Sequence, residues 1–151
     1  MAKGNALEQA RRVIDIEVAA LRRVRRRLGP SFLQTVTLMQ QRLDRGGKII
    51  VTGIGKSGHI GHKIASTLAS TGTTSVTLDP VDAVHGDLGV VARKDLILVL
   101  SYSGNTDELI RVIPLIKRQG VPIVVMTGNP RSELARQADF LLDVSVDQEA
   151  C

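Results

Sequence analysis

The first part of the chain carries apolar side chains at helical spacing. Apolar residues recur every seven positions from Leu7 to Leu28, which predicts a helix with one apolar stripe over that range. Gly29-Pro30 is expected to end this helix, and Ser31 is a candidate cap for a second helix that ends before Gly46-Gly47. The side chains expected to face inward from the second helix are those of Phe32, Val36 and Leu43. The sequence therefore predicts a helical hairpin whose apolar stripe packs on its own domain or on another subunit.

From residue 48 onward, strand-like apolar runs alternate with helix-like stretches. Most of the runs are continuously apolar and long connections separate them, as is typical of parallel strands buried on both faces. The expected strands are residues 48–52, 74–78, 95–100, 122–126 and 140–144. The expected helices among them are residues 57–71, 105–119 and 132–137. We predict an α/β fold, a doubly wound five-stranded parallel sheet flanked by helices, in which the hairpin (residues 1–46) and the sheet (residues 47–151) form one domain.

Composition and charge narrow the possible functions. The chain has one cysteine, no apolar run near the roughly 20 residues of a membrane span, and no apolar stretch typical of a signal peptide at its start. We therefore expect a cytoplasmic protein with no membrane partner. The net charge is +5, with five arginines between residues 22 and 27, but the chain has only three aromatic residues. Because single-stranded nucleic-acid binders use aromatic platforms, we expect no nucleic acid and interpret the arginines as a solvated face, an oligomer contact or an attraction for phosphate.

The loop after the first predicted strand is rich in glycine and leads into a helix. Its glycines, Gly53, Gly55 and Gly58, have the spacing G-x-G-x-x-G and enclose Lys56 and Ser57. Glycines let a backbone approach a ligand closely, and the free N–H groups at a helix start attract anions. In open parallel sheets, ligands bind at such loops. We expect an anionic ligand here; the alternative is a tight turn with an exposed lysine.

The same glycine spacing occurs in dinucleotide-binding folds, where an acidic residue ends the next strand. Asp79 occupies that position, so a nicotinamide-nucleotide binder is an alternative. Lys56 and Ser57 weaken it, because the dinucleotide fingerprint uses only backbone there. A P-loop is excluded, because Ile50 stands where its first glycine is required.

The loop after the third predicted strand is rich in hydroxyl groups. It contains Ser101, Ser103 and Thr106 around Gly104 and opens the next helix. Hydroxyl groups combined with the amides of a helix start can hold a phosphate without a metal. A single hydroxyl would be enough for an ordinary helix cap, so three of them favour a phosphate site.

These residues resemble a known family. The pattern Ser101-x-Ser103-Gly104-x-Thr106-x-Glu108 resembles the signature of sugar isomerase (SIS) domains. Residues 53–61, 83–89 and 147–151 resemble more specifically the arabinose-5-phosphate isomerases of that family. The resemblance runs from about residue 7 to residue 151.

The resemblance implies the SIS fold and an isomerase that interconverts D-ribulose 5-phosphate and D-arabinose 5-phosphate for Kdo and lipopolysaccharide biosynthesis, without a cofactor. It also implies a homotetramer. Family members continue past Cys151 and usually carry a pair of CBS domains, so we expect an SIS domain cut short at its C-terminus. The residues that match the family's catalytic positions are Lys56, His85, Glu108 and Glu149. Those that match its phosphate-holding positions are Ser57, Ser101, Ser103 and Thr106. Tyr102 and Asn105 differ from the commonest family residues, and we assign them no side-chain role.

An aldose–ketose isomerase moves a proton between two carbons, with a cis-enediol as the expected intermediate. Glu108 and Glu149 are the candidate carbon bases, Lys56 the stabiliser of the negative oxygen, and His85 the proton shuttle between oxygens. The alternatives are that Glu108 complements a helix dipole and that His85 is a structural hydrogen-bonding residue. His59 is a candidate substrate contact. No His, Cys and Asp cluster has metal-ligand spacing, so we expect no metal.

Two further functions fit the same loops. A sugar-phosphate sensor would use the phosphate site without chemistry, whereas the four candidate catalytic residues favour an enzyme. Another phosphosugar isomerase, such as a hexulose-phosphate isomerase, would have the same architecture.

Overall fold

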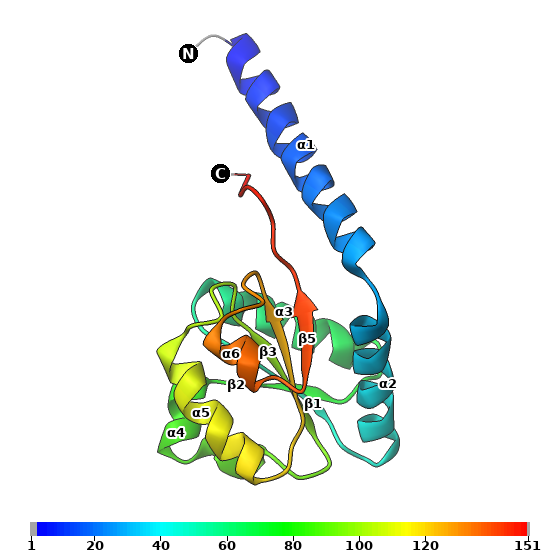
Figure 1. The fold of residues 1–151 in the computed structure, drawn as a ribbon, viewed down its shortest axis with the longest axis vertical. Coiled ribbons are helices and arrows are strands. Elements are labelled where there is room, and N and C mark those ends of the chain that lie inside the picture. Colours follow the sequence, from blue (N-terminus) through cyan, green and yellow to red (C-terminus); the bar gives the residue numbers. More distant parts are fainter. Residues whose placement is uncertain (1–2, 151) are drawn as a thin grey trace.

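The computed structural model describes residues 3–150, which form a five-stranded parallel sheet with helices on both faces (Figure 1). Cys151, the last residue of the motif at 147–151, lies outside the described residues. The strands are β1 (Ile49–Gly53), β2 (Ser75–Leu78), β3 (Leu96–Leu100), β4 (Ile123–Thr127) and β5 (Phe140–Asp143). The helices are α1 (Lys3–Arg27), α2 (Pro30–Asp44), α3 (Lys56–Ser70), α4 (Pro80–His85), α5 (Asp107–Arg118) and α6 (Glu133–Gln137).

The strand order is β2-β1-β3-β4-β5, and all neighbouring strands are parallel. The chain adds β2 on one side of β1 and then returns to add β3 on the other side. The order therefore reverses between β1 and β3, and their last residues, Gly53 and Leu100, are register partners. This confirms the doubly wound fold and places the two candidate loops next to each other at the switch point, where such sheets bind ligands.

Alternating strand residues pack on two layers of helices, as the period of a strand requires. Ile50, Ile97 and Val99 belong to one buried cluster together with the apolar face of α5. Ile49 and Leu98 belong to the other, which α2 and α3 cover. Because both faces are buried, the strands are continuously apolar, and this is why the sequence identified them.

Helix α1 extends away from the sheet, whereas α2 packs beside β5 (Figure 1). Helix α1 ends before Gly29-Pro30, as predicted. Its apolar stripe lies open in the single chain, because Leu7, Ile14, Leu21 and Leu28 are all more than half exposed. Among the helices of residues 3–150, none is both long and apolar enough to cross a membrane.

Two predictions for α2 were wrong. Ser31 does not cap the helix, which already starts at Pro30; its hydroxyl donates to the Leu141 carbonyl at 2.6 Å and ties α2 to β5. Phe32 and Val36 do not face inward, because they are 39% and 45% exposed. The residues of α2 that pack toward the sheet or are buried are Thr35, Leu38, Met39 and Leu43. Leu43 therefore packs inward as predicted, whereas Thr35, Leu38 and Met39 take the places expected for Phe32 and Val36.

The segment after β2 also differs from the prediction, which placed no helix between residues 78 and 95. It contains α4 and a 3₁₀ turn over Asp87–Val90. Asp79 caps α4 by accepting the N–H of Val81 at 2.8 Å, and Pro80 occupies the first helical position, which proline favours. A helix of six residues is too short to show an apolar period, so only this start signal was available in the sequence.

Candidate functional site

Glycines bring the start of α3 close to the sheet. A Cβ atom on Gly58 would lie 2.8 Å from the Gly53 carbonyl oxygen, and one on Gly53 would lie 3.0 Å from that of Leu100. Larger residues at either position would force β1, β3 and α3 apart. Gly55 has a φ of +57°, which glycine adopts without strain. Helix α3 therefore begins directly at the carboxyl edge of the sheet.

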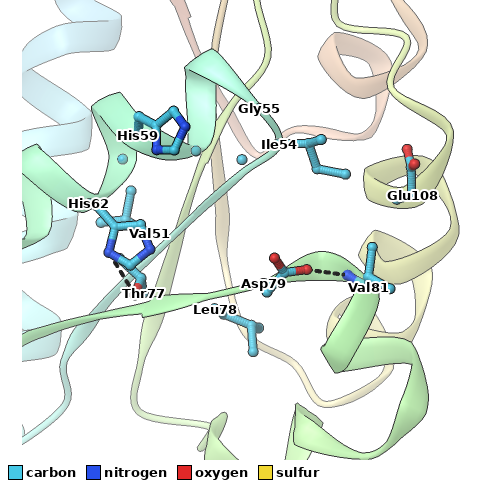
Figure 2. Close-up of a pocket in the computed structure, with 13 residues that line it drawn as sticks. Val51, Ile54, Gly55, His59, His62, Thr77, Leu78, Asp79, Val81 and Glu108 are labelled. Carbon is cyan, nitrogen blue, oxygen red and sulfur yellow. Dashed lines mark hydrogen bonds between the residues drawn. The ribbon is translucent and has the colours of Figure 1, made fainter.

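A cavity of about 250 Å³ opens beside this loop, between α3, the end of β2 and the start of α5 (Figure 2). Its polar lining side chains are those of His59, His62, Thr77, Asp79 and Glu108. In Figure 2, Glu108 lies on the opposite side of the cavity from the two histidines. The volume is close to the lower end of the range for small-molecule pockets. Within residues 3–150, no group of three or more His, Cys, Asp or Glu side chains is arranged to hold a metal ion.

Two of the lining side chains already have partners in the fold. His62 Nδ1 lies 3.5 Å from the hydroxyl of Thr77. Asp79 Oδ1 accepts the N–H of Val81 as the cap of α4. This second contact weighs against the dinucleotide alternative, in which the same carboxylate would bind a ribose.

The loop of residues 101–106, here called the hydroxyl loop, is shaped by its own side chains. Ser101 is 3% exposed, and its Oγ lies 2.8 Å from the hydroxyl of Thr106. The same Oγ accepts the N–H of Gly104 at 3.1 Å. Ser103 Oγ accepts the N–H of Asn105 at 3.3 Å. These bonds link the side chains of the loop to one another and to its backbone.

Contacts with α6 hold the hydroxyl loop from outside. Gly104 has a φ of +66°, and a Cβ atom there would lie 1.9 Å from Ser132 Oγ, so only glycine fits. Asn105 Oδ1 accepts the N–H of Glu133 at 3.0 Å, and the N–H of Leu134 donates to the Gly104 carbonyl at 3.0 Å. Asn105 therefore has a side-chain role that sequence reasoning missed. The available signal was an asparagine next to a glycine, a combination that favours turns.

Helix α5 begins at the hydroxyl loop. Thr106 occupies the N-cap position, yet its side chain makes no cap hydrogen bond within the described residues. Its hydroxyl is bonded to Ser101 instead. The first N–H groups of α5 are therefore available to a ligand, which favours an anion site over an ordinary cap.

The structure brings one of the four predicted catalytic side chains into the cavity. Glu108 lines it from the first turn of α5. Lys56 starts α3, His85 ends α4, and Glu149 lies beyond β5; all three are exposed, and none is among the described residues that line the cavity. Ser57 is half-buried beside Lys56. The catalytic and phosphate-binding roles assigned to these residues stay predictions.

Comparison with known proteins identifies the family. A model of the SIS domain family matches residues 43–151. The chain belongs to the SIS domain family. This SIS domain is 46% identical over 145 residues to the arabinose 5-phosphate isomerase KdsD of Pseudomonas aeruginosa, and 43% identical over 145 residues to the arabinose 5-phosphate isomerase GutQ of Escherichia coli K12. The matches cover 96% of this chain but 44% of each relative, so the chain spans less than half the length of these proteins.

A solved structure agrees with this assignment. An Escherichia coli CFT073 protein in complex with arabinose 5-phosphate matches the SIS domain with a TM-score of 0.91 and 32% identity, over 100% of this chain and 79% of that chain. The homologues are thus sugar-phosphate isomerases and sugar-phosphate binders of the same fold.

Proposed function

We propose that this SIS domain binds a sugar phosphate and provides the isomerase site of an arabinose-5-phosphate isomerase. The observation that carries the proposal is the hydroxyl loop beside the cavity. It contains the hydroxyls of Ser101, Ser103 and Thr106, and no N-cap side chain among the described residues bonds to the first N–H groups of α5, a combination suited to a phosphate. The names of the relatives supply arabinose 5-phosphate as the substrate, and the family resemblance implies its exchange with D-ribulose 5-phosphate.

In the proposed reaction, a carboxylate removes a proton from carbon to form an enediol. Glu108 is the first candidate, because it lines the cavity. Lys56 would stabilise the negative oxygen, and His85 would transfer protons between the oxygens. Glu149 is the alternative base, on the segment beyond β5. The proposed setting is the cytoplasm, in the supply of arabinose 5-phosphate for Kdo and lipopolysaccharide.

The exposed stripe of α1 supports the homotetramer expected from the resemblance. The last six residues of α1 include five arginines, whereas the residues before them carry both signs of charge: Lys3, Glu8, Arg11, Arg12, Asp15 and Glu17. Two copies that pair through α1 would bury their apolar stripes against each other.

A thermal-shift titration tests the binding step. A ligand that binds only the folded state raises the midpoint of unfolding in proportion to RT ln(1 + [L]/Kd). D-arabinose 5-phosphate should raise the midpoint more than inorganic phosphate does, and NAD should leave it unchanged. A shift with NAD alone would contradict the proposal and favour a dinucleotide site at Gly53–Gly58.

A sugar-phosphate sensor is the second candidate. It is favoured by the placement of Lys56, His85 and Glu149 outside the described cavity lining. An isomerisation assay on the same chain separates the two functions. Binding of arabinose 5-phosphate with conversion to ribulose 5-phosphate supports the isomerase, and binding without conversion at any protein concentration supports the sensor.

A further inference from the structure

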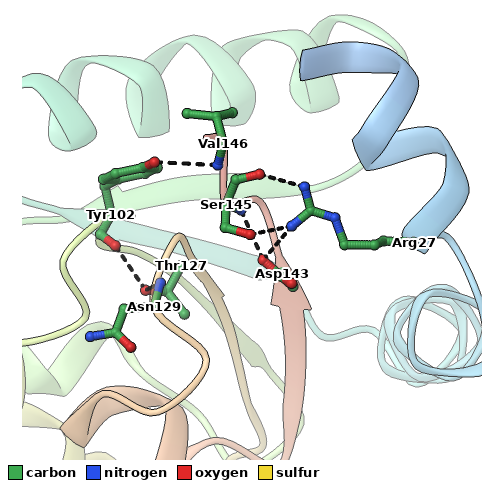
Figure 3. A network of polar contacts seen from close by, with 7 residues as sticks. All are labelled: Arg27, Tyr102, Thr127, Asn129, Asp143, Ser145 and Val146. Carbon is green, nitrogen blue, oxygen red and sulfur yellow. Dashed lines mark hydrogen bonds and ion pairs between the residues drawn. The ribbon is translucent and has the colours of Figure 1, made fainter. Parts of the chain in front are cut away.

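The segment of residues 144–150, here called the tail, continues from β5, where the Val144 N–H donates to the Thr127 carbonyl at 3.0 Å. Side chains hold it at three further places, of which Figure 3 shows the contacts of Arg27 and Tyr102. Arg27 donates to Asp143 Oδ1 at 2.8 Å and also to the hydroxyl and the carbonyl of Ser145. Arg23 pairs with Asp147. The N–H of Val146 donates to the Tyr102 hydroxyl at 3.4 Å. The first two anchors come from α1, but the third comes from the hydroxyl loop.

The backbone and the ring of Tyr102 contact the end of β4. Its carbonyl accepts the N–H of Gly128 at 3.0 Å and the hydroxyl of Thr127 at 3.1 Å. Its ring lies so close over Gly128 that a Cβ atom there would be 2.5 Å from a ring carbon. Tyr102 stands between Ser101 and Ser103, two of the proposed phosphate contacts. The residue that holds the tail is therefore part of the proposed phosphate site.

The bond from Val146 to Tyr102 is sensitive to movement of the loop. A donor–acceptor distance of 3.4 Å is beyond the usual range for an N–H donor. A small displacement of Tyr102 toward Val146 would therefore strengthen the bond, and one away from it would break it. The half-exposed ring leaves room for such a displacement.

We propose that Tyr102 couples ligand binding at the hydroxyl loop to the placement of the tail, which carries Glu149. The coupling rests on the function proposed above, because it requires a phosphate at the hydroxyl loop. A phosphate that engages Ser101 and Ser103 moves the residue between them, and the Val146 N–H follows its hydroxyl. Linkage makes the effect reciprocal, so a fixed tail also favours the liganded loop. Tyr102 is a positioning residue, and it acts through Glu149.

The anchor at Arg27 has a different role, because it holds the base of the tail with or without a ligand. Burial tends to raise the pKa of Asp143, but hydrogen bonds from the Ser145 amide and hydroxyl and from Arg27 outweigh it and hold that pKa below its ordinary value. Asp143 is therefore ionised at neutral pH, and its pair with Arg27 persists. Only the Tyr102 contact joins the tail to the hydroxyl loop among the hydrogen bonds of residues 3–150.

The chain carries its own probe for this coupling, since Tyr102 is its only tyrosine and it has no tryptophan. Tyrosine emission should change when arabinose 5-phosphate or inorganic phosphate is titrated, with the same midpoint that calorimetry gives for binding. In parallel, hydrogen exchange followed by NMR should show the Val146 amide exchanging about 3- to 10-fold more slowly in the liganded chain, the effect expected for one strengthened hydrogen bond.

Tyr102→Phe removes the hydroxyl and keeps the ring over Gly128. In this variant the Val146 amide should exchange faster, and its ligand-dependent slowing should disappear. In the isomerisation assay kcat should fall by about 5-fold, while KM changes by less than about 2-fold, because the phosphate contacts themselves remain. Arg136→Gln, which breaks an exposed pair with Glu133 on α6, is the matched control and should leave the tail unchanged.

The outcomes separate the two proposals. If calorimetry detects no binding of either phosphate ligand to the natural chain, the proposed function fails and the coupling fails with it. If the ligands bind but the Val146 amide and the tyrosine emission do not respond, only the coupling is overturned. Equal ligand-dependent slowing in Tyr102→Phe would also overturn it, since the slowing would then not pass through the hydroxyl.

Discussion

Strand β3 has a buried polar residue at each end: Asp95 precedes it and Ser101 follows it. Asp95 is fully buried, and Ser101 is 3% exposed. Each organises a loop by accepting backbone N–H groups. Asp95 accepts those of Lys48 at 3.0 Å and Ala92 at 2.8 Å, and Ser101 accepts that of Gly104 at 3.1 Å. The same hydrogen-bonding device thus stabilises both edges of the sheet.

The two ends differ in charge. Asp95 is ionised and paired with Lys48 Nζ at 2.6 Å, so its negative charge is neutralised locally. Ser101 is neutral and lies where α5 presents its first N–H groups. A carboxylate in place of Ser101 would repel a phosphate, whereas a hydroxyl can donate to it. A charged side chain, Asp95, thus stabilises the loops at the edge without a candidate site, whereas neutral groups shape the loop of the candidate site.

Gly104→Ala should give the largest effect, because it breaks the hydroxyl loop. Alanine is strained at a φ of +66°, and its Cβ would overlap Ser132 Oγ. Either the loop or the start of α6 must then move. We expect the free energy of unfolding to fall by about 4 kcal/mol, the sum of backbone strain and overpacking, as measured by urea denaturation.

Gly55→Ala is the matched control for this change. Gly55 also has a positive φ, but a Cβ atom there meets open space among the described residues. Its substitution should therefore cost only the backbone strain, about 1.5 kcal/mol. Equal losses in the two variants would show that the contact with Ser132 does not select glycine at position 104.

Asp95→Asn tests the charged end of β3. Burial tends to raise the pKa of Asp95, but hydrogen bonds from the side chain and backbone of Lys48 and from Ala92 outweigh it, so the pKa lies below its ordinary value of 3.8. A depressed pKa in the folded state stabilises the fold above the unfolded pKa, and this contribution is lost as the pH falls below about 4. The variant should lose about 2 kcal/mol at pH 7 and show a shallower decrease of the melting temperature between about pH 4 and pH 2.

Asp44→Asn, at an exposed position of α2, controls for the removal of a negative charge. It should leave both the stability at pH 7 and the decrease of the melting temperature at acid pH nearly unchanged. The melting temperature could instead decrease equally steeply at acid pH in Asp95→Asn and in the natural chain. Other carboxylates would then determine the acid sensitivity, and the charge at Asp95 would not distinguish that end of β3 from the neutral end.

The sequence was sufficient to predict the strands of the sheet, but not helix α4 or the surface that covers α1. All five strands lie within about two residues of their predicted bounds, because strands buried on both faces are continuously apolar. Helix α4 was missed, because six residues do not establish a period. The stripe of α1 was recognised, but periodicity says nothing about which surface covers it, and in the single chain it lies open.

The sequence could predict which loops form the candidate site, but not which side chains contact one another in it. Strand ends and hydroxyl groups located residues 101–106, and the structure puts Glu108 in the adjacent cavity. The roles of Tyr102 and Asn105 depend on Val146 and Glu133, which are distant in sequence. No local pattern reports such partners. For the same reason the sequence could not show that Lys56, His85 and Glu149 lie outside that cavity.

Ser101→Ala should have the smallest effect on stability and the most specific effect on binding. It removes the bonds to Thr106 and Gly104, so we expect a loss of about 1 kcal/mol in the free energy of unfolding and about 10-fold weaker binding of inorganic phosphate by calorimetry. Lys56→Ala, at an exposed position, should weaken phosphate binding by about 2-fold but lower turnover far more, since its proposed role is to stabilise the reacting oxygen.

Lys63→Ala, which removes another exposed lysine of α3, is the control for charge alone and should change neither property. If Lys56→Ala weakened phosphate binding as much as Ser101→Ala and lowered turnover only in proportion, Lys56 would be a phosphate anchor. The anion site would then be charged, and the contrast between the two ends of β3 would no longer hold. If binding and turnover separate as expected, the neutral hydroxyl loop holds the phosphate, and the positive charge of Lys56 acts on the reacting end of the sugar.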